Sequence, residues 1–235
     1  LTPTTLLAFQ HFQTFTQRFQ DLAVKVGMVS RLVSPKEQKI TIDKTLKGQT
    51  DVLIGTHRIL SADVKFKDLG LLIIDEEQRF GVKHKEKFKH LRESLDVLTL
   101  TATPIPRTLH MALSGVRQIS VIDTPPENRR PINTYVAPFD NGWTKRAIIE
   151  ELRRGGQVYY VFNRVEKIDL KAAFLRDLVP EARIIVAHGQ MDEKIVEKTM
   201  LAFIQNKFDV LLTTTIIESG LDIPNVNTLI VDDAE

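Results

Sequence analysis

The chain has 235 residues, of which 43% are hydrophobic and 26% are charged, with eleven glycines and ten prolines. This composition excludes collagen-like, low-complexity and coiled-coil chains and predicts one large globular domain or two of ordinary size. The absence of cysteine excludes a disulfide framework, a thiolate zinc site and a cysteine nucleophile. No apolar run reaches the roughly 20 residues of a membrane span, and no signal-peptide pattern is present, so we expect a cytoplasmic protein.

The net charge of +2 is unevenly distributed. Residues 1–123 carry 18 basic and 13 acidic side chains, a balance of +5, whereas residues 124–235 carry 14 and 17, a balance of −3. Between these halves, Thr124–Pro131 contains three prolines in eight residues, which neither a helix nor a sheet interior tolerates. We therefore predict domains over residues 1–124 and 135–235, joined by a proline-rich linker at 125–134.

In both halves, short β-branched apolar runs alternate with stretches of helical period, which is typical of a parallel sheet covered by helices. In the first half, Ser34-Pro35-Lys36-Glu37 predicts a helix start, because serine can cap, proline fits the first turn and glutamate completes a capping box. The predicted strands of this half are Asp51–Gly55, Leu71–Asp75, Val97–Thr101 and Ile119–Ile122.

The second half repeats the pattern. Its predicted helices cover Thr144–Arg154, Lys167–Leu178 and Asp192–Asn206, and its predicted strands are Val158–Phe162, Arg183–Val186, Val210–Thr213 and Thr228–Val231. The sequence thus favours two successive α/β domains of about 110 residues each.

Ligands of open parallel sheets bind beyond the carboxyl ends of the strands. At such an end, an aliphatic run leads into Asp75, Glu76 and Glu77, whose charges repel one another unless a cation lies among them. Magnesium held by Asp75, with a water oriented by Glu76 for attack on a γ-phosphate, would explain the cluster. Alternatively, the acids only lie near the N-terminus of the next helix, where the helix dipole favours negative charge.

The next predicted strand leads into Thr101-Ala102-Thr103-Pro104. The hydroxyls of Thr101 and Thr103 could bind the neighbouring carboxylates and report their state to whatever packs above. The alternative is a threonine-rich turn in which proline begins a helix.

Two loops of the first half carry hydroxyls, a glycine and basic side chains that suit contacts to a phosphodiester backbone. These residues are Thr4, Thr5, Gly55, Thr56, His57 and Arg58. Thr4 could equally only cap the following helix. A run of basic residues, in which Glu86 and Glu93 are the only compensating acids, favours a nucleic-acid partner, although most charge runs are solvated surface. Its members are Arg79, Lys83, Lys85, Lys87, Lys89 and Arg92.

In the second half, Thr213–Thr215 follows a predicted strand and leads to Glu218–Pro224. Gly220 permits close backbone approach, and Asp222 could accept a hydrogen bond from a ribose hydroxyl or bind a cation. A simple loop is the alternative. The six histidines show no metal-ligand spacing, so we expect none to bind a metal.

Five ordered motifs that span nearly the whole chain resemble those of superfamily 2 helicases and translocases. They are Leu1–Ala8, Gly55–Arg58, Asp75–Val82, Thr101–Pro104 and Thr213–Pro224. Arg79–Val82 and Thr103–Thr108 resemble the branch shared by bacterial transcription-repair coupling factors and RecG-type fork-reversal helicases. Further segments are more similar to the coupling factors, namely Leu109–Gly115, Thr124–Pro126 and His188–Met191.

The resemblance implies two RecA-like domains, with ATP and magnesium between them and double-stranded DNA across both. It implies that Asp75 binds the metal, that Glu76 activates water and that Gln78 belongs to the same catalytic turn. Thr101 and Thr103 would couple hydrolysis to DNA movement. The nucleotide site would be completed by Gly220 and Asp222, and the DNA contacts by Thr213 and Thr214.

In coupling factors, domain closure and opening move the protein along DNA, push a stalled RNA polymerase off a lesion and recruit excision-repair proteins. The resemblance therefore implies this function. The alternatives are a RecG-type fork-reversal helicase and a non-catalytic DNA-binding scaffold that keeps the fold.

Two features depart from the family pattern. Gln78 stands where this branch usually has histidine. The chain contains no Gly-x-x-x-x-Gly-Lys-[Ser/Thr] phosphate loop and stops before the segment that would supply arginine fingers. Both domains are thus expected to be incomplete at the chain ends, and the 235 residues alone to hydrolyse ATP poorly or not at all.

Overall fold

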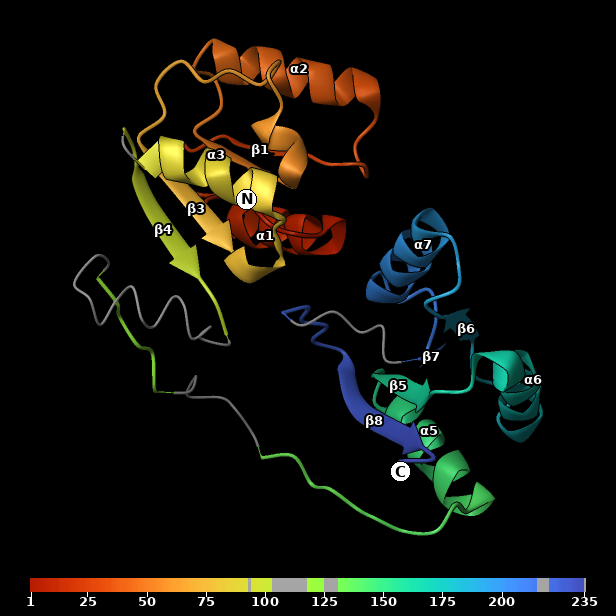
Figure 1. Cartoon of the computed structure of the whole chain (residues 1–235). Helices are drawn as coiled ribbons and strands as arrows, with labels where there is room; N and C mark the ends of the chain where they lie inside the picture. Colours follow the sequence, from red (N-terminus) through yellow and green to blue (C-terminus); the bar gives the residue numbers. More distant parts are fainter. Residues whose placement is uncertain (93, 103–117, 125–130, 215–219, 235) are drawn as a thin grey trace.

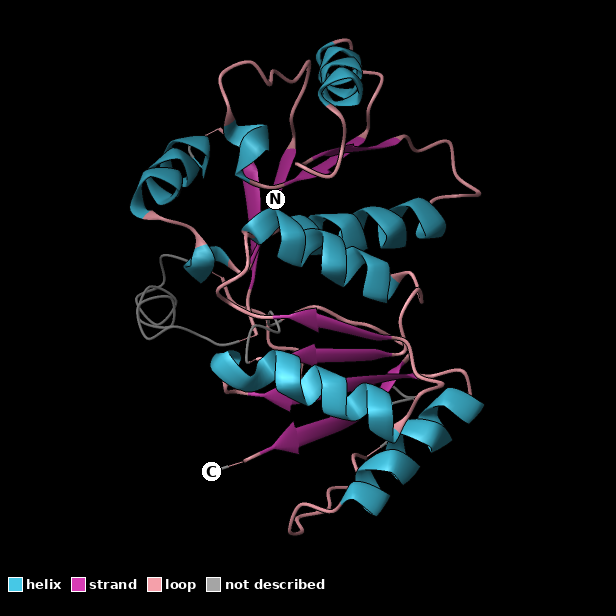
Figure 2. Cartoon of the chain, turned by 90° about the vertical axis from the view of Figure 1, so that its right-hand side faces the viewer, coloured by secondary structure: helices cyan, strands magenta, loops and turns pink. Residues whose placement is uncertain are grey.

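The computed structural model of the chain describes residues 1–92, 94–102, 118–124, 131–214 and 220–234. Figure 1 shows two α/β parts that follow each other along the chain, and Figure 2 shows helices lying against their strands. All the strand pairs of the described residues are parallel. None of the described helices is long and apolar enough to cross a membrane.

The first part begins with a helix and alternates thereafter. Its elements are α1 (Thr5–Arg18), β1 (Val26–Val29), α2 (Pro35–Leu46), β2 (Val52–Gly55), η1 (His57–Leu60), β3 (Leu71–Asp75), η2 (Glu77–Arg79), α3 (Val82–Arg92) and β4 (Asp96–Leu100). The predicted start of α2 is confirmed, because Ser34 and Glu37 form the capping box and Pro35 stands in the first turn. The hydrophobic core of this first part includes Val29, Ile74 and Phe88, which are fully buried.

Strand β1 pairs with β2, and β3 pairs with β4. The chain's first two residues lie between these pairs. The Leu1 nitrogen donates to the Ile73 carbonyl (2.8 Å), and the Leu1 carbonyl accepts from the Asp75 amide (2.9 Å). On the other side, the Thr2 amide donates to the Gly55 carbonyl (2.9 Å). Leu1 and Thr2 therefore connect β2 to β3.

The second part has one four-stranded sheet in the order β6-β7-β5-β8. Its elements are α5 (Asn141–Arg153), β5 (Gln157–Phe162), η3 (Val165–Lys167), α6 (Ile168–Leu178), β6 (Ile184–Ala187), α7 (Glu193–Ile204), β7 (Val210–Thr213) and β8 (Val226–Asp232). Alternate residues of a strand face opposite sides of the sheet. Accordingly, Leu212 packs in the cluster with α5 and α6, whereas Leu211 packs in the cluster with α7. Helices thus cover both faces.

The sequence predicts seven of the strands to within two residues of their ends, but it misses β1. That run has only four residues and includes Gly27, so its apolar signal is short.

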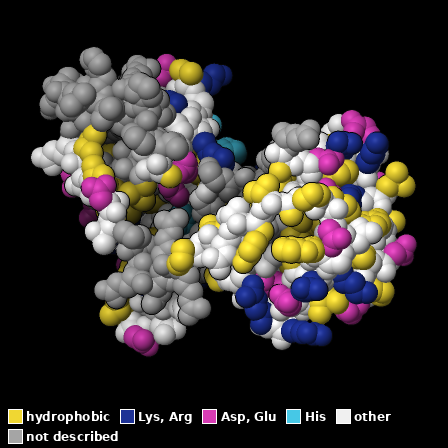
Figure 3. Space-filling model, turned by 90° about the horizontal axis from the view of Figure 1, so that it is seen from below, with side chains coloured by type: hydrophobic (Ala, Val, Ile, Leu, Met, Phe, Trp, Pro, Cys, Tyr) yellow, Lys and Arg dark blue, Asp and Glu magenta, His cyan; other side chains and the backbone are white. Residues whose placement is uncertain are grey.

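The predicted strand at Ile119–Ile122 is wrong. These residues pair with no strand of the described chain, and Val121 and Ile122 are 71% and 91% exposed, because an apolar run needs a partner edge to become a strand. Other hydrophobic side chains also lie at the surface in the view from below (Figure 3). Residues 125–130 of the predicted linker lie outside the described residues.

Candidate nucleotide and DNA site

The acidic turn, which consists of Asp75, Glu76 and Glu77, lies at the carboxyl end of β3. Asp75 ends the strand, and its Oδ2 lies 2.9 Å from Nε2 of His11 on α1. The hydrogen bond from His11 holds the pKa of the Asp75 carboxyl below its usual range. Glu76 follows with φ at 52°, a left-handed conformation that is uncommon for a residue with a side chain, and its side chain is buried. Strained backbone of this kind is concentrated at functional sites.

Gln78 connects the acidic turn to the end of the neighbouring strand. Its side-chain amide donates to Glu76 Oε2, and its Oε1 accepts from the Thr101 hydroxyl (3.3 Å). The Glu76 amide also donates to the Leu100 carbonyl (2.9 Å), immediately before Thr101. A change at the Glu76 carboxylate can therefore reach the segment after β4 through one side chain. Thr103, the second predicted coupling residue, lies outside the described residues.

The acidic turn fits a magnesium ion that arrives with a nucleotide. Within the described ranges, no group of three or more His, Cys, Asp or Glu residues could hold a metal by itself. Magnesium in phosphate sites needs only one or two protein carboxylates, since phosphate oxygens and water supply the remaining ligands. The Asp75 side chain is 20% exposed and contacts His11 through Oδ2, so it can serve as such a ligand.

The predicted nucleotide residues of the second domain lie against α1. The Asp222 amide donates to Oε1 of Gln10 (2.9 Å), and the Asp222 side chain is exposed. Gly220 has φ at +86°, and a Cβ placed there would lie 3.5 Å from Leu7. Glycine therefore suits this position through its backbone conformation. The preceding residues 215–219 lie outside the described residues.

A cavity of about 150 Å³ gathers several predicted DNA contacts between the two domains. Its lining residues include Thr4, Thr5, Thr56 and His57 from the first domain and Glu193, Glu197 and Leu221 from the second. Thr4 also caps α1, because its hydroxyl accepts from the Leu7 amide (3.4 Å). The alternative role of Thr4 as a helix cap is thus confirmed, while its contact with DNA stays a prediction.

The other predicted DNA contacts have structural partners in this arrangement. Arg58 forms a bidentate ion pair with Asp63. A Cβ on Gly55 would lie 2.3 Å from the Val29 carbonyl, so β1 and β2 require glycine there. Thr213 and Thr214 are buried, and the Thr213 hydroxyl donates to the Thr214 carbonyl (3.0 Å). DNA could therefore contact these residues only through their backbone atoms or after their side chains rearrange.

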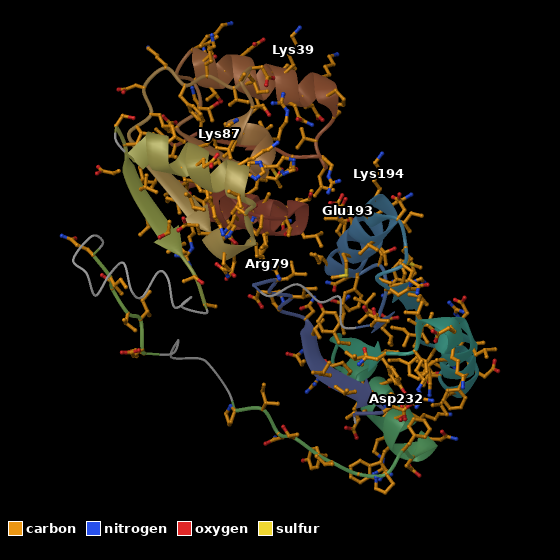
Figure 4. All side chains as sticks on the ribbon, in the orientation of Figure 1. Lys39, Arg79, Lys87, Glu193, Lys194 and Asp232 are labelled. Carbon is orange, nitrogen blue, oxygen red and sulfur yellow. The ribbon has the colours of Figure 1, made fainter. Side chains whose placement is uncertain are left out.

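Sequence reasoning missed Arg31, which lines the same cavity. Its guanidinium donates to both oxygens of Glu193 (3.0 and 2.6 Å) and to Glu197 (2.8 Å). Figure 4 shows Glu193 at the end of α7 that faces the first domain. The hydrogen bonds from Arg31 hold the pKa of the Glu193 carboxyl below its usual range. No local sequence pattern predicts the ion pair of Arg31 and Glu193, because the two residues are 162 positions apart.

Two family models account for most of the chain. Residues 1–112 match the DEAD/DEAH box helicase, and residues 143–235 match the helicase conserved C-terminal domain. The chain belongs to the superfamily 2 helicases. The predicted fold class is also confirmed, since tandem helicase domains of this kind have the RecA-like α/β architecture.

Curated relatives of this helicase chain include the transcription-repair-coupling factors of Bacillus subtilis (strain 168) and Staphylococcus aureus (strain USA300). They are 57% and 55% identical over all 235 residues. The chain spans 20% of the length of each relative.

Solved structures with the same fold include RecG bound to a three-way DNA junction, with 32% identity and a TM-score of 0.74 over 97% of this chain and 31% of RecG. A S. cerevisiae Dbp5 variant bound to Gle1 is 15% identical, with a TM-score of 0.71 over 99% of this chain and 60% of Dbp5. The likeness to Dbp5 concerns the fold alone.

Proposed function

We propose that the chain is the motor core of an ATP-dependent double-stranded DNA translocase that displaces stalled RNA polymerase during transcription-coupled DNA repair. The 57% identity to a transcription-repair-coupling factor along the entire chain carries this proposal. RNA polymerase and excision-repair proteins would bind regions outside these 235 residues. The curated relatives are bacterial, and bacterial DNA and RNA polymerase lie in the cytoplasm, so the proposed protein would act there.

The proposed chemistry is hydrolysis of ATP at the acidic turn. Magnesium, when bound with ATP, would neutralise phosphate charge and hold the γ-phosphate in place. Asp75 would hold that ion. The Glu76 carboxylate would orient the attacking water and accept its proton, while the Gln78 amide fixes the direction of this carboxylate through their hydrogen bond.

Coupling of hydrolysis to movement would use residues on both domains. Thr101, which donates to Gln78, would pass the state of Glu76 to the segment that includes Thr103. Gly220 and Asp222 would approach the nucleotide from the second domain. Duplex DNA would contact the loops at Thr4–Thr5, Gly55–Arg58 and Thr213–Thr214, mainly through its phosphates, so binding would track the backbone without reading sequence.

The test is Glu76→Gln in the full-length protein. The amide is nearly isosteric with the carboxylate but cannot accept the proton, so ATP binding should persist while DNA-stimulated turnover falls about 100-fold or more. Glu86→Gln, an exposed change on α3, is the matched control and should leave turnover unchanged. Wild-type turnover in Glu76→Gln would remove the proposed role of this residue.

Fork reversal is the second candidate, because RecG has the same fold at 32% identity and a TM-score of 0.74. The two functions separate in one comparison. A coupling factor should release a stalled transcription complex and leave a model replication fork largely intact, whereas a fork-reversal helicase should do the opposite. DNA binding with no ATP turnover by the full-length protein would instead support the scaffold alternative.

A further inference from the structure

Helix α1 belongs to the first domain by sequence but packs against both domains. Leu6 is 5% exposed and lies in the apolar cluster that includes Phe203 and Leu211 of the second domain. Leu7, the next residue, lies beside Gly220 of the same domain. The first turns of α1 are therefore fixed to the second domain by burial of apolar side chains.

The following turn of α1 makes one polar contact to each domain. Oε1 of Gln10 accepts from the Asp222 amide in the second domain (2.9 Å), and Nε2 of His11 lies 2.9 Å from Asp75 Oδ2 in the first. Gln10 and His11 are consecutive, and consecutive residues of an α-helix point about 100° apart. Two neighbouring side chains thus reach two different parts of the proposed nucleotide site.

We propose that Gln10 and His11 are positioning residues that make the placement of the Asp75 carboxylate depend on contact between α1 and the Gly220–Asp222 loop. This inference rests on the proposed function, in which Asp75 holds the ion of the ATP complex. When the loop engages Gln10, α1 is held in the position from which His11 orients Asp75. When the second domain moves away, this restraint on His11 is lost.

Physical reasons support transmission over this short path. The Gln10 and His11 side chains share a backbone within an α-helix, whose hydrogen bonds allow little relative movement of adjacent residues. Hydrogen bonds to a ligating carboxylate orient it, and removal of such outer partners typically reduces metal affinity 10- to 100-fold. The contact of Gln10 uses the backbone of Asp222, so it reports the position of the loop irrespective of that residue's charge.

The first experiment measures how much Mg²⁺ the full-length protein needs for half-maximal binding of a fluorescent ATP analogue. His11→Ala should raise this concentration about tenfold, and His11→Gln, whose amide can still donate to Asp75, should recover most of the loss. Gln10→Ala should raise it about fivefold, the usual effect of one lost hydrogen bond, although that hydrogen bond is to Asp222 and not to Asp75. Gln13→Ala on the exposed side of α1 is the matched control and should change nothing.

The second experiment measures amide hydrogen exchange without nucleotide or Mg²⁺. The Asp222 amide should exchange faster in Gln10→Ala, and by reciprocity also in His11→Ala, but not in Gln13→Ala. The double variant Gln10→Ala/His11→Ala should need no more Mg²⁺ than the weaker-binding single variant, because both changes break one path. Thermal melts check folding, and Gln10→Asn, which is too short to reach the amide, serves as the second variant.

Two results would overturn the inference. One is a Gln10→Ala or Gln10→Asn protein that matches Gln13→Ala while His11→Ala requires more Mg²⁺, since Gln10 and His11 would then act separately. The other is a double variant whose effect equals the product of the single effects. Failure of the proposed function is distinguishable, because it appears as undiminished hydrolysis in Glu76→Gln.

Discussion

Replacement of Gln78 tests whether the contact between the acidic turn and the end of β4 contributes to hydrolysis. Gln78→Ala removes the amide that donates to Glu76 and the oxygen that accepts from Thr101. Hydrogen bonds to charged groups contribute about 1.5–3 kcal/mol net. Because Gln78 is partly exposed, we take the lower limit, and about 1.4 kcal/mol corresponds to a tenfold change in rate.

The expected result is a kcat for DNA-stimulated ATP hydrolysis about tenfold lower in the full-length protein, with the KM for ATP within about twofold of wild type. Gln78→His keeps a donor and should lose less activity. Gln78→Glu places a second carboxylate beside Glu76 and should lose more than Gln78→Ala. Gln49→Ala, an exposed glutamine change elsewhere, is the control. A Gln78→Ala protein with wild-type kcat, or one changed only in KM, would refute the reasoning.

Three further predictions concern stability. Glu151 is fully buried and accepts hydrogen bonds from Thr228 and Asn227 as well as from the exposed Arg154, so Glu151→Ala leaves those two donors without their acceptor and should lower the free energy of urea unfolding by about 1–3 kcal/mol, which wild-type stability would contradict. The Tyr159 hydroxyl is buried without a hydrogen-bond partner among the described residues, so Tyr159→Phe should raise the same free energy by about 1 kcal/mol. Burial raises the pKa of Tyr159 to about 12, so the free energy of unfolding should not depend on this group below its unfolded pKa of about 10 and should fall as pH rises from there toward 12. The decline should be smaller in Tyr159→Phe but not absent, because burial also raises the pKa of Tyr160.

Local patterns in the sequence predict most of the fold. The capping box at Ser34 predicts the start of α2, because its chemistry is contained within four residues. The aliphatic run before Asp75 predicts β3 and places the acidic turn at a strand end. The run at Ile119–Ile122 misleads, since composition cannot state whether an edge is available for pairing.

The arrangement of the candidate site is less predictable than its members. The contact between Gln10 and Asp222 joins residues 212 positions apart, and that between Arg31 and Glu193 joins residues 162 apart. Nothing in the spacing of residues along the chain specifies such partners, because they depend on how two separately built sheets meet. The left-handed backbone at Glu76 also lacks a sequence signal, since glycine or asparagine is the usual occupant of that conformation.

The burial of Leu6 bears on how the two domains can move. Complete separation would expose this leucine to water at a cost of about 1.5–3 kcal/mol, before any polar contact is broken. A limited rotation of the second domain that keeps Phe203 and Leu211 against Leu6 avoids this cost while other contacts change. The burial of Leu6 on α1 therefore makes a limited rotation of the two domains energetically easier than a hinge motion that separates them completely.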